Sequence, residues 1–130
     1  VNGLKELIPA RPVHGLKIAV LGLTYKKDVG DTRDSPAEKV IDGLKHLSFE
    51  VAVHDPTLPA STTKFGCKNL TLEKAAKDAD CLVFLTDHTS FENSIEKLGR
   101  LVHNPCLLVD TKRIFAPSDF LKTGLLYKRL

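Results

Sequence analysis

The sequence contains no apolar stretch close to the roughly 20 residues that a membrane-spanning helix needs. Its first residues, VNGLKELIPARPVHG, also lack the basic segment and the apolar core of a secretory signal. These absences argue against both a membrane protein and a secreted protein. We therefore expect the protein to be cytoplasmic.

Cysteine is scarce, since Cys67, Cys81 and Cys106 are the only three. The odd count and the absence of a CxxC spacing argue against a disulfide framework and against a zinc site. Cys81 and Cys106 each begin an apolar run, where a free thiol behaves as a small core side chain. The histidines show no metal-ligand spacing either, so we expect no metal ion.

Strong basic charge and exposed aromatic side chains, two marks of a nucleic-acid-binding surface, are also missing. The chain has two tyrosines and six phenylalanines, mostly in core-like positions. Its formal net charge of +3 is compatible with an anionic ligand but does not identify one. We expect no nucleic acid among the partners.

What the 130 residues do contain is an alternation of apolar runs and amphipathic segments, enough for one domain with its own core. Short, uninterrupted apolar runs are typical of strands that are buried on both faces of a parallel sheet. The predicted strands are 16–23, 50–56, 81–86, 106–111 and 124–130, and helices are predicted to follow the first three. This alternation predicts right-handed βαβ units. The expected fold class is α/β, a Rossmann-like doubly wound parallel sheet in a three-layer α-β-α arrangement.

Local signals place the ends of several elements. Ser35 is predicted to cap the first helix, with Pro36 at its first position. The polar stretch 57–69 is expected to be a connector. A single helix is predicted to follow the third strand, because apolar residues recur there at helical spacing. Residues 1–14, which contain two prolines, are interpreted as the end of a preceding helix and a linker, and residues 15–130 as the domain.

Polar residues follow four of the predicted strands. In open parallel sheets, ligands bind beyond the carboxyl ends of the strands. The candidate segments are 22–33, 55–56, 86–89 and 110–113. Because the strands are parallel, we expect all four segments at one edge of the sheet.

The loop after the first strand, GLTYKKDVGDTRDSP, contains neither GxGxxG nor the P-loop pattern. Lys26, Lys27 and Arg33 instead gather near a helix N-terminus, where unpaired N–H groups and the helix dipole favour an anion. The pattern predicts a phosphate or diphosphate site whose cations are held in place by three aspartates. These are Asp28, Asp31 and Asp34. A merely solvated surface loop remains the alternative interpretation.

Three other positions at this edge allow more than one role. Lys112 and Arg113 follow the fourth strand and are candidates to approach the same anion. Asp55, which precedes a proline, is either a turn former or a catalytic acid. His88 is either a base or ligand, or a hydrogen-bonded structural histidine. The residues alone therefore identify an anion-binding α/β domain with no assigned catalytic residue.

Four segments carry a more specific resemblance: KIAVLGLTYKKDVGDTRDSPAEKVIDGL, VAVHDP, ADCLVFLTDHTSF and LLVDTKRIF. Together they resemble the C-terminal, UDP-binding domain of the UDP-glucose/GDP-mannose dehydrogenase family, from about Gly15 to the end of the chain. The resemblance implies an NAD-dependent enzyme that oxidises the C6 hydroxyl of a UDP-sugar to a carboxylate in two hydride transfers. It also implies an N-terminal NAD-binding domain, a central helical domain that carries dimerisation, and a homo-oligomeric full-length form.

The same resemblance implies roles for individual residues. Tyr25 and Lys26 match the aromatic-Lys pair that contacts the UDP part of the substrate. Arg33 matches the arginine that reaches the pyrophosphate of NAD. Lys112 stands where the family usually has a substrate-contacting arginine, and Arg113 is the alternative for that role because a lysine has no guanidinium fork.

Other parts of the family pattern are absent from this chain. The nucleophilic cysteine of the family lies in its central domain, and none of the three cysteines here matches that motif. NAD is expected to be bound mainly by the N-terminal domain. We therefore expect a fragment that is inactive alone, although a free-standing nucleotide-binding module remains the rival hypothesis. The segment TDHTSF resembles the branch of the family that acts on UDP-N-acetylhexosamines, such as UDP-N-acetyl-D-mannosamine, more than the UDP-glucose branch.

Overall fold

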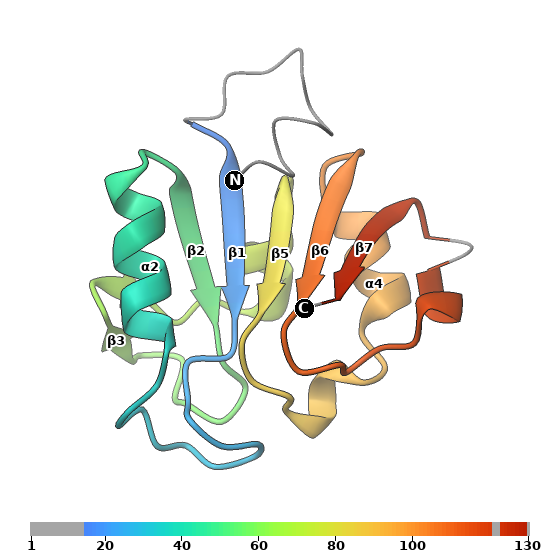
Figure 1. Cartoon of the computed structure of the whole chain (residues 1–130). Helices are drawn as coiled ribbons and strands as arrows, with labels where there is room; N and C mark the ends of the chain where they lie inside the picture. Colours follow the sequence, from blue (N-terminus) through green and yellow to red (C-terminus); the bar gives the residue numbers. More distant parts are fainter. Residues whose placement is uncertain (1–14, 121–122, 130) are drawn as a thin grey trace.

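The computed structural model describes residues 15–120 and 123–129, so the linker expected over residues 1–14 lies outside the described residues. The centre of the molecule is a five-stranded sheet in which every pairing is parallel (Figure 1). The strands are β1 (Lys17–Leu21), β2 (Glu50–His54), β5 (Cys81–Phe84), β6 (Cys106–Asp110) and β7 (Leu125–Arg129). Their spatial order is β2-β1-β5-β6-β7, the arrangement of flavodoxin-like doubly wound folds. The predicted α/β fold class is confirmed.

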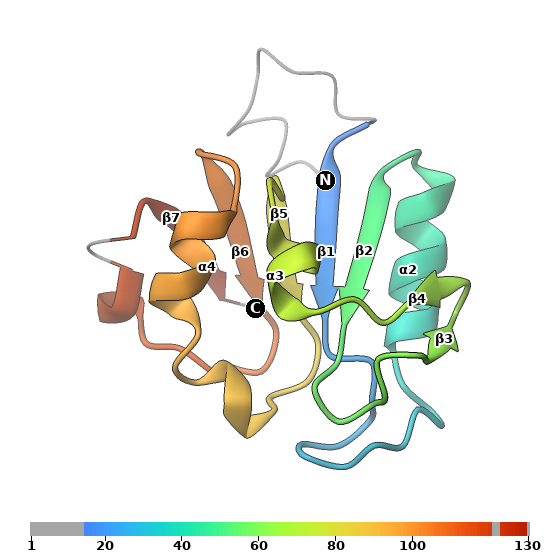
Figure 2. The same cartoon turned by 180° about the vertical axis from the view of Figure 1, so that it is seen from behind.

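Helices cover both faces of the sheet. Helix α2 (Ala37–His46) lies on one face, whereas α3 (Leu72–Ala76) and α4 (Ile95–Leu101) lie on the other, as the views in Figure 1 and Figure 2 show. The chain returns from β1 to β2 through α2 and then runs in the opposite direction across the sheet through α3 and α4. This reversal produces the three predicted layers.

The sheet therefore separates two hydrophobic cores. Along β1, Ile18 and Val20 belong to the core that contains Ala37 and Ile41 of α2. Their neighbours on the strand point to the opposite core, because successive side chains of a strand alternate between its faces. Both sides of β1 are apolar, which explains the uninterrupted apolar run in the sequence. Burying a side chain such as Ile41 stabilises the fold by roughly 1.5–3 kcal/mol.

Both predicted signal residues contribute to the first turn of α2, but the helix begins one residue later than predicted. The Oγ of Ser35 accepts a hydrogen bond from the N–H of Ala37 at 3.1 Å. Pro36 has helical angles, with φ −69° and ψ −11°, and its carbonyl accepts from the N–H of Val40. Proline has no N–H to leave unpaired at this position. The helix therefore begins at Ala37 with Pro36 as its cap residue, one position later than predicted, and Ser35 lies just before the cap.

Two expectations for the connecting segments are wrong in detail. The polar connector 57–69 contains a small hairpin, β3 (Thr63–Lys64) and β4 (Cys67–Lys68), whose turn residues Phe65 and Gly66 both have positive φ angles. Hairpins with two-residue turns require such angles, and only the glycine signals them in the sequence. Cys67 is buried as part of this hairpin.

The single helix predicted after the third strand is divided. A 3₁₀ turn, η1 (Thr89–Phe91), precedes α4, and a second turn, η2 (Pro117–Phe120), precedes β7. Between η1 and α4, both the N–H and the Oγ of Ser94 donate to the carbonyl of Phe91. A serine that bonds to the nearby backbone in this way competes with helix continuation.

The helices of the described residues are all too short or too polar to span a membrane.

Candidate functional site

The loops that follow β1, β2, β5 and β6 lie together at one edge of the sheet, the lower edge in Figure 1. This arrangement follows from the parallel pairing, because all the strands end on the same side. The four polar segments predicted to meet at one edge therefore do so. We call the longest of them, residues 22–35, the β1 loop.

The β1 loop leaves the sheet through a close contact with the end of β5. Gly22 has a φ of +100°, and a Cβ atom built on it would lie 2.7 Å from the backbone nitrogen and side chain of Thr86. Only glycine fits this position without displacing a neighbour. Just beyond it, the hydroxyl of Thr86 donates to the carbonyl of Thr24 at 2.7 Å. The direction of the β1 loop is thus set at its first residues.

The next part of the β1 loop folds back on itself around a surface cavity. The N–H of Tyr25 donates to the carbonyl of Asp31 at 3.1 Å. The cavity has a volume of about 330 Å³ and is lined by Tyr25, Lys26, Val29, Asp31, Arg33 and Asp34. Tyr25 is 55% exposed, so its side chain is accessible from solvent. Tyr25, Lys26 and Arg33, which the sequence singles out, are therefore brought to one place.

Arg33 is held by a neighbouring carboxylate. Its Nε lies 3.0 Å from Oδ1 of Asp31, and its terminal nitrogen lies 2.7 Å from Oδ2. The hydrogen bonds from Arg33 lower the pKa of Asp31 to about 2, and the same contact raises the pKa of Arg33. The guanidinium side chain nevertheless remains 87% exposed. Asp31 therefore restrains a cation at the cavity, as predicted.

Asp28 does not have the predicted role of holding a cation. Its carboxylate instead accepts hydrogen bonds from the hydroxyl and the N–H of Thr89 on η1. These bonds, the hydroxyl first, lower the pKa of Asp28. Lys27 pairs with Glu92 at 3.8 Å rather than with an aspartate of its own loop. The reason is tertiary, because η1 packs against the β1 loop and supplies better-placed donors.

The loop after β6 is fixed by the buried carboxylate of Asp110. This side chain accepts the N–H groups of Lys112 at 3.2 Å, Ile114 at 3.0 Å and Phe115 at 3.0 Å. It also accepts the hydroxyl of Tyr127 at 3.0 Å. The side chain of Lys112 is exposed at the same edge of the sheet as the β1 loop, but it is not one of the residues that line the cavity.

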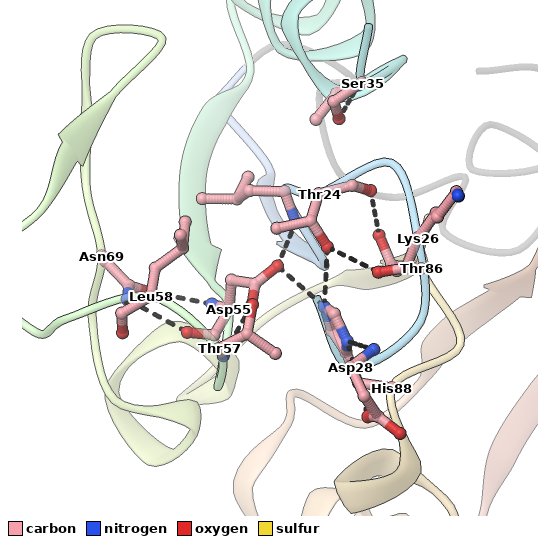
Figure 3. A network of polar contacts seen from close by, with 12 residues as sticks. Thr24, Lys26, Asp28, Ser35, Asp55, Thr57, Leu58, Asn69, Thr86 and His88 are labelled. Carbon is pink, nitrogen blue, oxygen red and sulfur yellow. Dashed lines mark hydrogen bonds and ion pairs between the residues drawn. The ribbon is translucent and has the colours of Figure 1, made fainter. Parts of the chain in front are cut away.

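Beneath the β1 loop lies a buried polar network centred on Asp55 (Figure 3). Oδ2 of Asp55 accepts the N–H of Leu23 at 2.6 Å and contacts Nε2 of His88 at 2.9 Å. Oδ1 accepts the N–H of Thr57 at 2.8 Å and its hydroxyl at 2.6 Å. Asn69 completes the network, because its side-chain oxygen accepts the N–H of Asp55 at 2.8 Å.

The electrostatic balance at Asp55 favours the charged carboxylate. Burial raises the pKa of Asp55, but the hydrogen bonds from His88, Thr57 and Leu23 together outweigh it, so the pKa lies below its ordinary value. Asp55 is 1% exposed and His88 is 0% exposed. A buried charge is tolerable only when it is paired and hydrogen-bonded in this way.

The contacts of Asp55 and His88 decide between the alternative roles that the sequence left open for each of them. Asp55 forms the turn before Thr57, and it also joins the β1 loop to the end of β2. His88 has both ring nitrogens in hydrogen bonds within the protein, so it is the structural histidine. Cys81 and Cys106 are core residues, and burial raises the pKa of the Cys81 thiol to about 12, which makes it a poor nucleophile.

Sequence reasoning missed the roles of several residues of this site, although two of them lie in candidate segments. Thr24, Asn69 and Asp110 are buried polar side chains that hold loops in place. Asp110 ends an apolar strand, which is a weak signal for such a role. Asn69 lies in a polar connector, and nothing in its sequence context distinguishes it from a solvated residue.

Comparison with known proteins identifies relatives of the chain. The model of the UDP-glucose/GDP-mannose dehydrogenase family, UDP binding domain, matches residues 19–117. UDP-N-acetyl-D-mannosamine dehydrogenase of Methanococcus vannielii is 34% identical and aligns with 100% of this chain and 29% of its own length. UDP-glucose 6-dehydrogenase of Rhizobium meliloti is 35% identical over 88% of this chain and 27% of its own length.

Solved structures show the same relation. UDP-D-ManNAc dehydrogenase from Pyrococcus horikoshii superposes with a TM-score of 0.75 at 28% identity, over 98% of this chain and 28% of that one. The UDP-N-acetyl-mannosamine dehydrogenase from Staphylococcus aureus gives a TM-score of 0.74 at 30% identity, over 98% of this chain and 29% of that one. The chain thus spans less than a third of the length of these relatives.

Proposed function

Because the chain belongs to the UDP-glucose/GDP-mannose dehydrogenase family and carries its UDP-binding domain, we propose that it binds the UDP part of a UDP-sugar within an NAD-dependent dehydrogenase. The observation that carries this proposal is the cavity of the β1 loop, where Tyr25, Lys26 and Arg33 meet at the carboxyl edge of the sheet. Ligands of open α/β sheets bind at this edge.

The side chains at the cavity suit a nucleotide diphosphate. Lys26 presents a compact ammonium group, which binds a phosphate oxygen as a point charge. Tyr25 presents an exposed aromatic face, on which a base or ribose packs. Lys112, or Arg113 next to it, contacts the substrate from the loop after β6. Asp110 already holds the N–H groups of Lys112 and Ile114 on either side of Arg113, so little ordering of that loop is needed on binding.

Arg33 is the residue of this chain that fits NAD, the cofactor that the family uses. Its guanidinium is exposed at the cavity, and a guanidinium recognises a pyrophosphate through paired hydrogen bonds. The pyrophosphate competes with Asp31 for this group. NAD supplies the hydride acceptor when it is bound. The residues that hold most of it, and the nucleophilic cysteine, belong to the parts of the enzyme outside this chain.

In the whole enzyme we propose that the C6 hydroxyl of the sugar is oxidised to a carboxylate, with two hydrides removed and one water oxygen added. The chain alone lacks most of this machinery, so it binds nucleotide without turnover. The full-length enzyme is a cytoplasmic homo-oligomer in this proposal. Sustained NADH production by this chain with NAD and UDP-sugars would refute the inactivity of the isolated domain.

The proposed sugar is N-acetyl-D-mannosamine, because the segment 86–91 resembles that branch and relatives with that activity align with the whole chain. UDP-glucose is the second candidate, because a relative with that activity is equally similar. Within the segment 86–91, Thr86 and His88 are buried and do not contact a sugar, whereas Thr89 and Ser90 are exposed. In this proposal the remaining domains select the sugar.

Titration of the chain with UDP, followed by heteronuclear NMR, tests the proposal. We expect shifts at residues 25–33 and a weakening of UDP affinity of about tenfold in Lys26→Ala, as for loss of one charge-assisted hydrogen bond. Lys39→Ala, an exposed lysine on α2, is the matched control and should bind UDP unchanged. GDP, UDP-glucose and UDP-N-acetylmannosamine serve as competitors. Equal responses to UDP and GDP, with no loss in Lys26→Ala, would leave only a general anion site.

A further inference from the structure

His88 has contacts on both sides of the segment that carries Tyr25 and Lys26. Its Nε2 lies 3.1 Å from the hydroxyl of Thr24, immediately before this pair. Its Nδ1 accepts the N–H of Asp28 at 2.9 Å, shortly after the pair. We propose that His88 is a positioning residue for nucleotide binding, which fixes residues 24–28 so that Tyr25 and Lys26 are presented to the ligand. This inference rests on the proposed function of the cavity.

The hydrogen bonds define which ring nitrogen of His88 carries the proton. The group that faces Nδ1 is a backbone N–H, which can only donate, so Nδ1 must be the unprotonated acceptor. Nε2 therefore carries the proton, and its N–H donates a hydrogen bond to Oδ2 of Asp55 at 2.9 Å. The carboxylate thus selects the tautomer that accepts from Asp28, which is the usual way in which one ring nitrogen is set by the partner of the other.

The contact at Asp28 occurs where the β1 loop changes direction. Asp28 has a φ of +57°, a left-handed conformation that aspartate adopts more readily than most non-glycine residues. Its N–H is held by His88, and its carboxylate is held by Thr89, the next residue along the chain. Adjacent residues at the end of β5 therefore hold the backbone and the side chain of the same turn.

Three alternatives for His88 are less consistent with these contacts. An acid-base role requires a ring nitrogen that reaches a ligand, but the ring is fully buried and both of its nitrogens are used. A direct contact with the phosphate is excluded for the same reason. The ring also packs on Phe91, with 5.6 Å between the ring centroids, but core packing alone does not account for its hydrogen bond with the N–H of Asp28. His88 acts through the β1 loop, as a side chain that orders a ligand-binding segment before the ligand arrives.

Two substitutions divide the contacts of His88. His88→Gln places an amide N–H near the position of Nε2 and keeps a donor for Asp55, but it lacks the acceptor for Asp28. His88→Asn places an oxygen near the position of Nδ1 and keeps that acceptor, but it lacks the donor for Asp55. His46→Gln, at an exposed histidine of α2, is the matched control. UDP affinity and amide hydrogen exchange are measured for each variant of the 130-residue chain.

We expect UDP affinity to fall about tenfold or more in His88→Gln and to be partly restored in His88→Asn. Amide protection should be lost first at residues 25–28, whereas the strands of the sheet stay protected. His46→Gln should match the parent chain in both measurements. The inference is overturned if folded His88→Gln binds UDP like the parent, or if both variants lose protection uniformly across the sheet.

Failure of this inference is distinguishable from failure of the proposed function. If the parent chain binds no UDP, the proposed function fails, whereas the exchange of residues 25–28 without nucleotide still shows whether His88 fixes them. If both His88 variants fail to fold, Thr24→Val removes the hydroxyl that lies beside Nε2 and that also donates to the carbonyl of Lys26, whereas Thr24→Ser keeps a hydroxyl for both contacts. Weaker UDP binding in Thr24→Val but not in Thr24→Ser, together with faster exchange of the Asp28 amide and a protected sheet, supports the inference. Unchanged UDP binding and unchanged Asp28 exchange in Thr24→Val overturn it.

Discussion

Replacement of Asp55 by asparagine tests the buried network most directly, because the side chain keeps its shape but loses its charge and one acceptor oxygen. Four donors face the carboxylate of Asp55. The N–H of Leu23 and Nε2 of His88 lie 2.6 Å and 2.9 Å from Oδ2, and the N–H and hydroxyl of Thr57 lie 2.8 Å and 2.6 Å from Oδ1. An asparagine amide can accept from only one of these two pairs.

The expected loss in the free energy of unfolding follows from the pair of hydrogen-bond donors that loses its acceptor. In one orientation, the amide oxygen of the asparagine stays near Leu23 and His88, and its NH₂ group faces the N–H of Thr57. In the other orientation, the NH₂ group faces the two fully buried donors, the N–H of Leu23 and Nε2 of His88. At least one donor is left unsatisfied, which costs about 1–3 kcal/mol, and the remaining bonds lose their charge assistance, which costs about 1 kcal/mol more. We expect a loss of about 3 kcal/mol in the free energy of unfolding. For a domain of this size that corresponds to a fall of roughly 10 °C in Tm.

Urea unfolding monitored by circular dichroism measures this loss, with Asp42→Asn on the exposed face of α2 as the control. The pKa of Asp55 is lowered in the folded protein, so its stabilising contribution is present above the unfolded value of about 3.9 and is lost as the pH falls through the folded value. The difference between the parent and the variant should therefore be constant near neutral pH and shrink below about pH 4. A variant within about 0.5 kcal/mol of its parent, or a difference that does not shrink in acid, would refute the reasoning.

Two further predictions concern the β1 loop. Gly22→Ala should lower the free energy of unfolding by roughly 2–4 kcal/mol, because its Cβ would lie 2.7 Å from Thr86 at a φ of +100°. Gly43→Ala in α2, whose Cβ would meet nothing within 4 Å, should instead raise the free energy of unfolding by about 0.5–1 kcal/mol. Equal effects of Gly22→Ala and Gly43→Ala in chemical unfolding would contradict this geometry. The ion pair of Arg33 with Asp31 should persist in mild acid and break only as the pH falls through about 2, the pKa of Asp31, which the Nε–H resonance of Arg33 reports. A transition near the ordinary value of about 3.9 would show that the pair does not form in solution.

The sheet could be predicted from the sequence because its strands are buried on both faces. The run around Ile18 and Val20 is apolar without alternation, and the strands after it repeat that pattern. The division between η1 and α4 was not predicted, because Phe91 and Ile95 are spaced as on one helix and both are buried. The side-chain bond of Ser94 that ends the turn has no periodic signature.

The sequence predicted which edge of the sheet carries the candidate site residues, because this depends on topology alone, but it did not predict their individual contacts. Parallel strands bring the β1 loop and Lys112 to one edge of the sheet, and this followed from the pattern. The partners of Asp28 did not follow, because His88 and Thr89 lie 60 and 61 residues from it in the sequence and meet it only in the folded chain. Asp28 was assigned to a neighbouring cation for that reason, whereas its partner is Thr89.

The way in which Asp110 holds the loop after β6 has a consequence for protein engineering. Its carboxylate bonds to the backbone of residues 112, 114 and 115, and it makes no use of the side chains of Lys112 and Arg113. The bonds that shape this loop are therefore independent of the side chain at position 112, which can be varied in a library for ligand preference while the scaffold beneath it is retained. Position 113 is more restricted, because Arg113 has a φ of +56°, which β-branched residues tolerate poorly.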